Sequence, residues 1–356
     1  MRAVVYRGVD DLRVETVPVP RIQSDELLVK VIACGVCPTD IKKIQYGTVP
    51  PPRIFGHETS GTIIQVGARL KGFRIGERVA LHHHVPCLDC HACRHRAFAQ
   101  CAQYKRTGIT AGFEPAGGGY AECVRVMRFV LPGVMRIPLR NSFLEGAMLE
   151  PVNTVLKAIN RLSLLPEDFV LVIGQGPIGL MFTRLLALRG MNVVASDLLP
   201  ARLKLAKKFG AKFALRADEN RFRAKAMEMT RAGGFDGAVV TVPSDTAVHQ
   251  AQELARGAGQ VLLFAHTRRG DSSELDLSAV CLDEKELIGS YSSDFTLQNE
   301  VAELVFGRSI DVRELITHQF PLEQTADAIR LAARPAAGSL KIVIVQDKGP
   351  RRSVCA

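Results

Sequence analysis

The sequence predicts an α/β protein in which a doubly wound parallel sheet follows an irregular, β-rich domain. Short apolar runs alternate with helical patterns from residue 168 onward, and a glycine-rich turn separates the first run from its helix. Residues 1–150 instead show short alternating strands, such as the segment 26–32, and resemble a distorted β-barrel. The length of 356 residues fits about two domains.

The doubly wound sheet is expected to contain six strands, at residues 168–173, 191–196, 212–215, 237–241, 259–265 and 286–290. The helices expected between them lie at 180–189, 200–209, 219–232 and 244–255. A helix at 322–333 and a strand at 340–345 are expected to return to the first domain. The polar, basic tail 346–356, with Arg351 and Arg352, is expected to be frayed.

A glycine-rich turn follows the strand at 168–173. It reads Gly174-Gln175-Gly176-Pro177-Ile178-Gly179, the fingerprint of a dinucleotide-binding Rossmann turn. Gly174 makes the turn, Gly176 admits the pyrophosphate, and Gly179 lets the helix pack on the strand. We therefore predict that Gly174, Gly176, Pro177, Ile178 and Gly179 bind a dinucleotide; the alternative is a glycine-rich turn without a ligand.

An acidic residue ends the next strand. Asp197 lies 18 residues after Gly179, close to the spacing of about 20 at which a carboxylate meets the adenosine ribose. Its carboxylate can accept both ribose hydroxyls and would repel a 2′-phosphate, so NAD is favoured over NADP. Arg202 is close enough in sequence to contact the cofactor as well, which keeps NADP open.

Nine cysteines are an odd number and argue against a complete set of disulfides. Four of them have the spacing Cys-x2-Cys-x2-Cys-x7-Cys, namely Cys87, Cys90, Cys93 and Cys101. Four thiolates fit a closed, structural zinc site in a lobe at residues 85–105. The alternatives are a disulfide pair and an iron–sulfur cluster, although a cluster motif normally ends in Cys-Pro and Ala102 follows here.

A second set of zinc-type ligands lies upstream and consists of Cys37 and the pair His57-Glu58. Glycines at 56 and 61 allow close backbone approach. By themselves, a cysteine and a histidine twenty residues apart do not establish a metal site. The run of histidines at 82–84 favours a strand that leads into the lobe, because alternate side chains of a strand face opposite ways.

These motifs occur in an order that resembles the zinc-containing medium-chain dehydrogenases. The resemblance rests on Cys37-x-Thr39-Asp40, Gly56-His57-Glu58-x-x-Gly61, the four-cysteine lobe and the central fingerprint, and it spans nearly the whole chain. Leu149-Glu150-Pro151 and the segment 315–322 look like the sorbitol and polyol dehydrogenase branch, and 315–322 also looks like the L-threonine dehydrogenases.

The resemblance implies a GroES-like catalytic domain at residues 1–153, an NAD-binding Rossmann domain at 154–290 and a return to the catalytic domain at 291–356. It implies two Zn²⁺ per subunit, one catalytic and one structural, and a homodimer or homotetramer. Cys37 and His57 should bind the catalytic zinc, with oxygen from Glu58 and Glu150, directly or through water. Without the resemblance, Glu150 would be read as a solvated loop carboxylate.

The family pattern also assigns roles to residues beside these ligands. Thr39 should hydrogen-bond the substrate hydroxyl, although a turn cap is its default interpretation, and Asp40 should hold the other ring nitrogen of His57. Many relatives pass the alcohol proton through a histidine at position 42, where this chain has Lys42. We expect Lys42 to be a surface charge near the cofactor, because a solvated lysine with a pKa of about 10.4 is a poor relay at pH 7.

The expected function is a zinc-dependent, reversible oxidation of a polyol or other secondary alcohol to a ketone with NAD. Zn²⁺, the Cys37 thiolate and one glutamate are together neutral, so we expect only one carboxylate to bind during hydride transfer. Residues 43–46, Phe113 and the region of Tyr291 are expected to shape the substrate pocket.

Other functions remain open. They are an L-threonine 3-dehydrogenase-like activity on an amino alcohol, another alcohol or aldehyde as substrate, and a non-catalytic role with the metal site intact. A zinc-bearing nucleic-acid binder has only the net charge of +10 and the lobe in its favour, without a basic run or aromatic platform, so we expect no nucleic-acid partner. The N-terminus lacks an apolar leader and no run reaches the roughly 20 residues of a membrane span, so we expect a cytoplasmic protein with no membrane partner.

Overall fold

The computed structural model describes residues 1–82, 85–102, 117–265 and 267–346. The chain divides into two compact units, one formed by Met1–Asn153 with Ser292–Ala356 and the other by Thr154–Tyr291. Among the described helices, none is long and apolar enough to cross a membrane. His83, His84, Phe113 and the basic tail lie outside the described residues.

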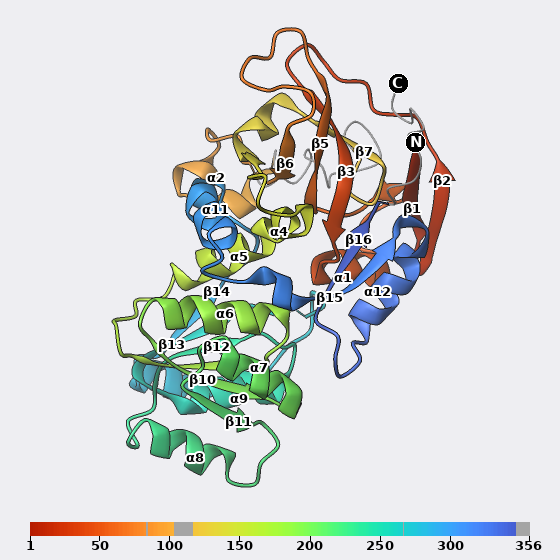
Figure 1. Cartoon of the computed structure of the whole chain (residues 1–356). Helices are drawn as coiled ribbons and strands as arrows, with labels where there is room; N and C mark the ends of the chain where they lie inside the picture. The colour runs from red at the N-terminus through yellow and green to blue at the C-terminus, as the bar shows by residue number, and fades with distance from the viewer. Residues whose placement is uncertain (83–84, 103–116, 266, 347–356) are drawn as a thin grey trace. The chain divides into compact units, whose positions relative to one another are not determined.

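The second unit, Thr154–Tyr291, is built on a sheet of six parallel strands. The strands are β9 (Phe169–Ile173), β10 (Asn192–Asp197), β11 (Phe213–Arg216), β12 (Phe235–Val240), β13 (Ala255–Leu263) and β14 (Glu286–Gly289). Their order, β11-β10-β9-β12-β13-β14, is that of a doubly wound Rossmann sheet (Figure 1). The predicted fold class is therefore confirmed.

Helices connect these strands, as parallel pairing requires. They are α6 (Pro177–Leu188), α7 (Pro200–Lys208), α8 (Phe222–Met229), α9 (Asp245–Leu254) and α10 (Leu277–Leu282). Helix α8 is shorter than the expected 219–232, because Arg231 and Ala232 adopt positive φ angles and end the helical geometry. Helix α10 was not expected and buries none of its residues.

The first unit contains a seven-stranded sheet and a three-stranded sheet. The larger has the order β15-β16-β3-β5-β6-β8, with β7 paired to β3, and the smaller has the order β2-β1-β4. The strands are β1 (Arg2–Gly8), β2 (Asp11–Thr16), β3 (Leu27–Gly35), β4 (Arg53–Ile54), β5 (Glu58–Val66), β6 (Arg78–Leu81), β7 (Cys123–Val126), β8 (Val134–Arg136), β15 (Ile316–Pro321) and β16 (Lys341–Val345).

Strand β16, from the C-terminal part of the chain, pairs antiparallel with β3 from the N-terminal part, as Figure 1 shows by colour. Strand β3 pairs on to β5, so β16, β3 and β5 are consecutive neighbours. The helices of this unit are α1 (Pro38–Tyr46), α2 (His91–Arg94), α4 (Phe143–Ala147), α5 (Leu149–Ile159), α11 (Gln298–Phe306) and α12 (Thr325–Ala333). The seven-stranded sheet of the first unit is therefore built from N-terminal and C-terminal strands together.

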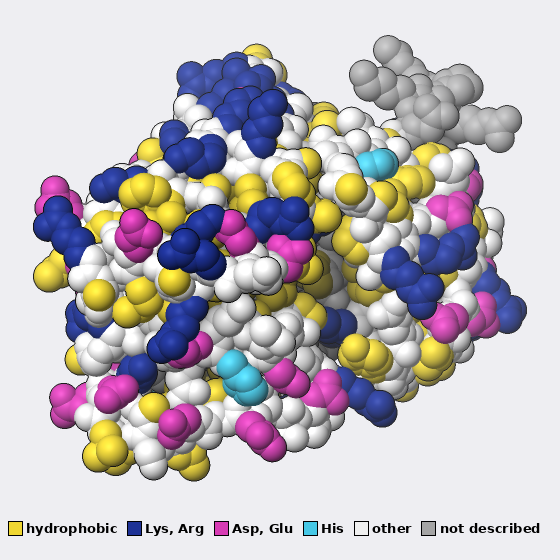
Figure 2. Space-filling model, turned by 90° about the horizontal axis from the view of Figure 1, so that it is seen from below, with side chains coloured by type: hydrophobic (Ala, Val, Ile, Leu, Met, Phe, Trp, Pro, Cys, Tyr) yellow, Lys and Arg dark blue, Asp and Glu magenta, His cyan; other side chains and the backbone are white. Residues whose placement is uncertain are grey.

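The excess of basic residues does not produce a uniformly positive surface on the face drawn in Figure 2. Lys and Arg side chains are mixed with Asp and Glu over most of this face, and one basic group stands out at its upper left edge. Many of the described arginines form ion pairs with neighbouring carboxylates, including Arg216 with Asp218 and Arg313 with Asp311. Such local pairing reduces the field that the net charge could project.

Candidate active site

Cys37 lies at the junction between β3 and α1. It occupies the N-cap position of α1, with extended backbone angles, and Pro38 follows as the first helical residue. Proline at this position is favourable because the first helical N–H has no partner within the helix. The junction leaves the Cys37 side chain half-buried, while Asp40 in the first turn of α1 is fully buried.

His57 and Glu58 stand where the chain enters β5. One ligand atom from each of Cys37, His57 and Glu58 lies within 4.8 Å of the other two, and the two later residues are buried. A thiolate, an imidazole and a carboxylate are the donor types that Zn²⁺ takes. The sequence motifs from two separate segments thus meet in a group that fits a zinc ion.

Asp40 lies against the ring of His57. The Nδ1 atom of His57 is 3.1 Å from Oδ2 of Asp40, and the same oxygen accepts a hydrogen bond from the Gly56 N–H at 3.1 Å. Burial alone would lower the pKa of His57, but the carboxylate of Asp40 outweighs burial and raises that pKa well above its usual value. With Nδ1 facing Asp40, Nε2 is the ring nitrogen left for a metal.

Glu58 is paired with a residue that the motifs do not include. The Nζ atom of Lys341 donates hydrogen bonds to Oε1 of Glu58 at 2.6 Å and to the carbonyl of Val36 at 2.9 Å. It also lies 2.5 Å from Oε2 of Glu58. Both carboxylate oxygens of Glu58 therefore face the ammonium group of Lys341, and each keeps a further lone pair that a metal could use.

Glu150 lies in the first turn of α5 and is buried. Burial, and next the negative charge of Glu58, raise its pKa to about 7, whereas His57 and Lys341 oppose the rise. Glu150 therefore interacts electrostatically with His57 and Glu58. It is not one of the three residues whose ligand atoms lie within 4.8 Å of each other. The solvated-loop interpretation of Glu150 is wrong.

Thr39 and Lys42 both lie on α1, in the first turns after Cys37, and both are half-buried. Burial lowers the pKa of Lys42, while the nearby Cys37 opposes this shift. Lys42 is therefore only partly solvated, and its expected role as a surface charge near the cofactor stays a prediction. A lysine whose pKa is lowered by burial exchanges protons more readily near neutral pH than a solvated one.

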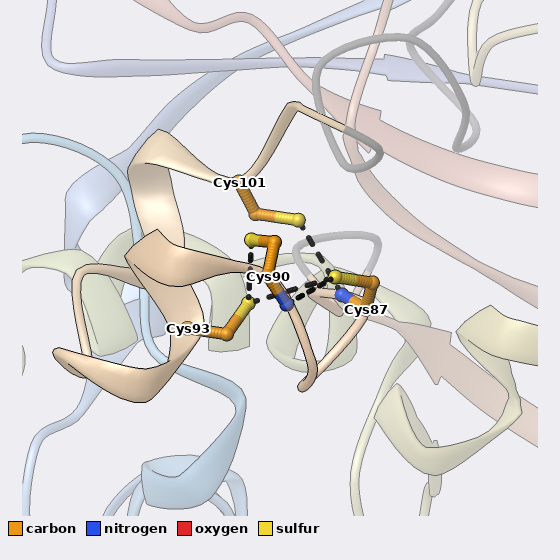
Figure 3. A group of neighbouring side chains, drawn as sticks. All are labelled: Cys87, Cys90, Cys93 and Cys101. Carbon is orange, nitrogen blue, oxygen red and sulfur yellow. Dashed lines mark hydrogen bonds between the residues drawn. The ribbon is translucent and has the colours of Figure 1, made fainter.

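The four cysteines of the lobe lie together, with their sulfur atoms turned toward one another (Figure 3). Sγ of Cys93 is 3.5 Å from Sγ of Cys90 and 3.9 Å from Sγ of Cys87. Tetrahedral zinc with bonds of about 2.3 Å would place sulfurs about 3.8 Å apart, whereas a disulfide needs about 2.05 Å. The arrangement fits a four-thiolate zinc site and excludes disulfides among these cysteines.

Backbone N–H groups support negative charge on the lobe sulfurs. The Cys90 N–H donates to Sγ of Cys87, and the Cys87 N–H donates to Sγ of Cys101, each at 3.4 Å. Hydrogen bonds from the backbone of Asp89 and Cys90 lower the pKa of Cys87 to about 6. A thiolate is thus available at neutral pH before a metal arrives. His91 and His95 are exposed and lie beside each other on the surface of the lobe.

The glycine-rich turn of the second unit has the geometry that its three glycines predict. Gly174 has a φ of 91°, in the left-handed region. A Cβ on Gly179 would lie 1.8 Å from the carbonyl oxygen of Gly174, so the helix packs on the turn only because no side chain is present. A Cβ on Gly176 would meet nothing within 4 Å, so this glycine faces open space. Pro177 and Ile178 begin α6.

Asp197 at the end of β10 also contacts this turn. Oδ2 accepts the Gln175 N–H at 2.6 Å, Oδ1 accepts the Leu199 N–H at 2.8 Å, and Nη1 of Arg202 lies 3.8 Å from Oδ2. Each carboxylate oxygen has a second lone pair, so Asp197 can still accept a ribose hydroxyl. The backbone N–H groups of Gln175 and Leu199 therefore hold this carboxylate beside the glycine-rich turn.

Three residues that support these sites were missed in the sequence. Lys341 and Gly35 surround Glu58, and Thr241 holds the glycine-rich turn by donating from Oγ1 to the carbonyls of Ile173 and Gly174. None of them belongs to a motif, because each reaches its site through strand pairing with a distant segment. The one available signal was a lysine at the start of β16, whose other residues are all apolar.

Comparison with known protein families matches both units. Residues 23–135 match the model of the alcohol dehydrogenase GroES-like domain, and residues 177–306 match that of the zinc-binding dehydrogenases. Sorbitol dehydrogenase of Bacillus subtilis (strain 168) is 29% identical over 354 residues, which cover 98% of each chain.

Solved structures agree over the same length. A protein of Sinorhizobium meliloti 1021 described as a zinc-binding dehydrogenase, bound to NADP, is 27% identical with a TM-score of 0.86, covering 97% of this chain and 98% of its own. Galactitol-1-phosphate dehydrogenase of Escherichia coli is 26% identical with a TM-score of 0.84, covering 97% and 100%. With both family models, the two ligand groups and the Rossmann sheet in place, the chain belongs to the zinc-containing medium-chain dehydrogenases.

Proposed function

We propose that this protein oxidises a secondary hydroxyl of a polyol to a ketone with NAD, and catalyses the reverse reduction. The observation that carries the proposal is the group formed by Cys37, His57 and Glu58, with Glu150 close enough to interact with it electrostatically. Glu150 stands where liver-type alcohol dehydrogenases have their second cysteine ligand. Relatives named for sorbitol and galactitol 1-phosphate support a polyhydroxylated substrate.

Several residues of the site would share the work of the reaction. Cys37, His57 and a glutamate would hold the catalytic zinc, which when bound supplies a Lewis acid that lowers the pKa of a substrate hydroxyl. Asp40 fixes the ring of His57 through Nδ1 and so keeps Nε2 available. Thr39 would accept a hydrogen bond from the substrate hydroxyl at Oγ1 and, as it takes that proton, pass its own proton on. Lys42 at Nζ would be the next group on α1 able to receive it.

For the nucleotide we propose NAD rather than NADP. Gly174, Gly176, Pro177, Ile178 and Gly179 would cradle the pyrophosphate at the start of α6, and the Asp197 carboxylate would accept the ribose hydroxyls. Arg202 stands 3.8 Å from Asp197 and could draw a 2′-phosphate, and a related structure binds NADP, so both nucleotides belong in the test.

A substrate panel tests the activity. Purified protein is assayed for NADH or NADPH absorbance with polyols, simple secondary alcohols, L-threonine and aldehydes. We expect the largest kcat/KM with a polyol and NAD, and loss of at least about a hundredfold in Cys37→Ala. A larger kcat/KM with L-threonine would assign the amino-alcohol activity instead, and no turnover with any alcohol in a zinc-replete protein would contradict the proposal.

We further propose that the protein carries two zinc ions per subunit and assembles from identical subunits, as a dimer or tetramer. Strand β14 is the edge of the six-stranded sheet, and within the described residues it pairs only with β13. Beside it, Leu277 and Leu282 of α10 are 72% and 82% exposed. An open strand edge next to exposed leucines suits pairing with a second copy about a two-fold axis.

A further inference from the structure

The ion pair between Glu58 and Lys341 lies against the ligand group. Lys341 is 5% exposed and Glu58 is 1% exposed, so both charges are withdrawn from water. The Nζ atom of Lys341 contacts three oxygens: Oε1 and Oε2 of Glu58 and the carbonyl oxygen of Val36. A buried lysine with such partners is held firmly, because leaving either charge without its partner is costly.

Strand register explains how this pair forms. Gly35 on β3 is opposite Glu58 on β5 and Val343 on β16, and Lys341 stands two residues before Val343. A Cβ on Gly35 would lie 1.8 Å from Oε2 of Glu58, so the glycine leaves the space that the carboxylate fills. Glu58 is thus fixed with both carboxylate oxygens against Nζ of Lys341, at 2.6 Å for Oε1 and 2.5 Å for Oε2.

The negative charges around the Cys37–His57–Glu58 group explain why a lysine ammonium group lies beside it. Cys37, Glu58 and Glu150 carry three negative charges when ionised, one more than Zn²⁺ can balance. Lys341 supplies the missing positive charge: its ammonium group pairs directly with Glu58 and acts on Glu150 through space. Asp40 faces the far nitrogen of His57 and acts at a greater distance.

We propose that Lys341 is a positioning residue whose ammonium group serves as the counter-charge of Glu58, so that this site can carry two glutamates and remain neutral when zinc is bound. The proposal rests on the proposed zinc-dependent function and refines it. By holding Oε1, Lys341 limits the negative charge that Glu58 presents to a metal. Removing the ammonium should therefore make the site bind zinc more tightly and polarise a substrate hydroxyl less.

Zinc retention tests the proposal without turnover. Full-length zinc-loaded protein is incubated with a chelator, and the released metal is counted, with Cys37→Ala identifying which zinc is lost first. We expect Lys341→Met to slow release of that zinc about tenfold or more, because a nearby positive charge is gone. Lys341→Arg should release it as the original protein does. Unchanged or faster release in Lys341→Met would overturn the proposal.

A matched control separates this effect from the general loss of a buried lysine. Lys285 in the other unit is also largely buried, donates to the carbonyl of Gln252 at 3.0 Å and pairs with Asp283 at 3.3 Å. Lys285→Met should leave zinc release unchanged. If Lys285→Met slowed the release as much as Lys341→Met, the specific role of Lys341 would be refuted.

A second pair of variants keeps the test valid should Lys341→Met fail to fold. Glu58→Gln leaves the ammonium of Lys341 unbalanced beside the metal, and adding Lys341→Met removes this repulsion. We expect the double variant to retain zinc about tenfold longer than Glu58→Gln alone. Equal or shorter retention would refute the counter-charge. Because no alcohol or nucleotide is present, failure to oxidise polyols would not affect this result.

Discussion

Lys42 lies on α1 at the position where many relatives carry a proton-relaying histidine. Its half-buried side chain lies near Cys37, and burial lowers its pKa. A lowered pKa increases the fraction of neutral amine near pH 7, which is the form that accepts a proton. The side chain therefore combines a suitable place with a suitable protonation equilibrium.

We predict that Lys42→Ala lowers kcat for alcohol oxidation near pH 7 by about tenfold or more, and that a small primary amine restores part of the rate. Lys71→Ala, at an exposed position outside α1, is the control and should retain its rate. The measurement is a pH profile of kcat with and without amine. An unchanged kcat in Lys42→Ala would show that the proton leaves by another route.

Single residues show how far sequence reasoning reaches at this scale. His57, Glu58 and Asp40 stand in short motifs whose chemistry is legible in the sequence, and the structure brings all three to one place. Lys341 is 283 residues away from Glu58 and belongs to no motif. Its partner depends on the pairing of β16 with β3, which is a long-range contact that local patterns do not encode.

Helix α4 begins with a complete capping box. Oγ of Ser142 accepts the Glu145 N–H, and the Glu145 carboxylate accepts the Ser142 N–H at 2.7 Å. Asn141 and Arg308 donate to the same carboxylate at 2.9 and 3.1 Å. Burial would raise the pKa of Glu145, but these hydrogen bonds outweigh burial and lower it. The short helix is thus tied to the loop before it and to the end of α11.

We predict that Glu145→Gln lowers the free energy of unfolding by about 1–3 kcal/mol at pH 7. The folded-state pKa is lowered, so the stabilisation is present above the unfolded pKa of Glu145 and is lost as the pH falls through the folded one. Denaturant unfolding at several pH values measures the difference, which should shrink in acid. Glu303→Gln, at an exposed position of α11, is the control. A difference independent of pH would argue against an ionic contribution.

Elements with a buried apolar face could be predicted, and elements without one could not. The strands of the six-stranded sheet are apolar runs, and α6 and α9 have helical spacing, so each appears near its expected place. Helix α10 has no buried residue, so no periodic pattern marks it.

At the scale of the whole molecule, we predict that Leu282→Glu weakens assembly and lowers the molar mass measured by light scattering toward that of one subunit. A charge placed in an apolar contact between subunits loses hydration without gaining a partner. Leu139 is 92% exposed in the first unit, and Leu139→Glu is the matched control. An unchanged mass for Leu282→Glu would place the interface elsewhere.

We also predict about two zinc ions per subunit, of which a chelator removes one readily. The lobe site offers four thiolates and is closed, whereas the site of Cys37 and His57 must keep a position open for substrate. Metal analysis before and after chelation measures both. Cys90→Ser should lose the slowly released zinc and lower the stability of the lobe. Equal release of both ions would contradict the assignment of an open and a closed site.

The pairing of β16 with β3 has a consequence for how the protein is made. Lys341 reaches Glu58 only after more than nine-tenths of the chain has left the ribosome, since β16 begins at residue 341 of 356. Until then Glu58 lacks its cation, whereas the four lobe cysteines span only residues 87–101 and can meet early in synthesis. We therefore expect a nascent chain to acquire its lobe metal first and to finish the other site only after β16 has been made.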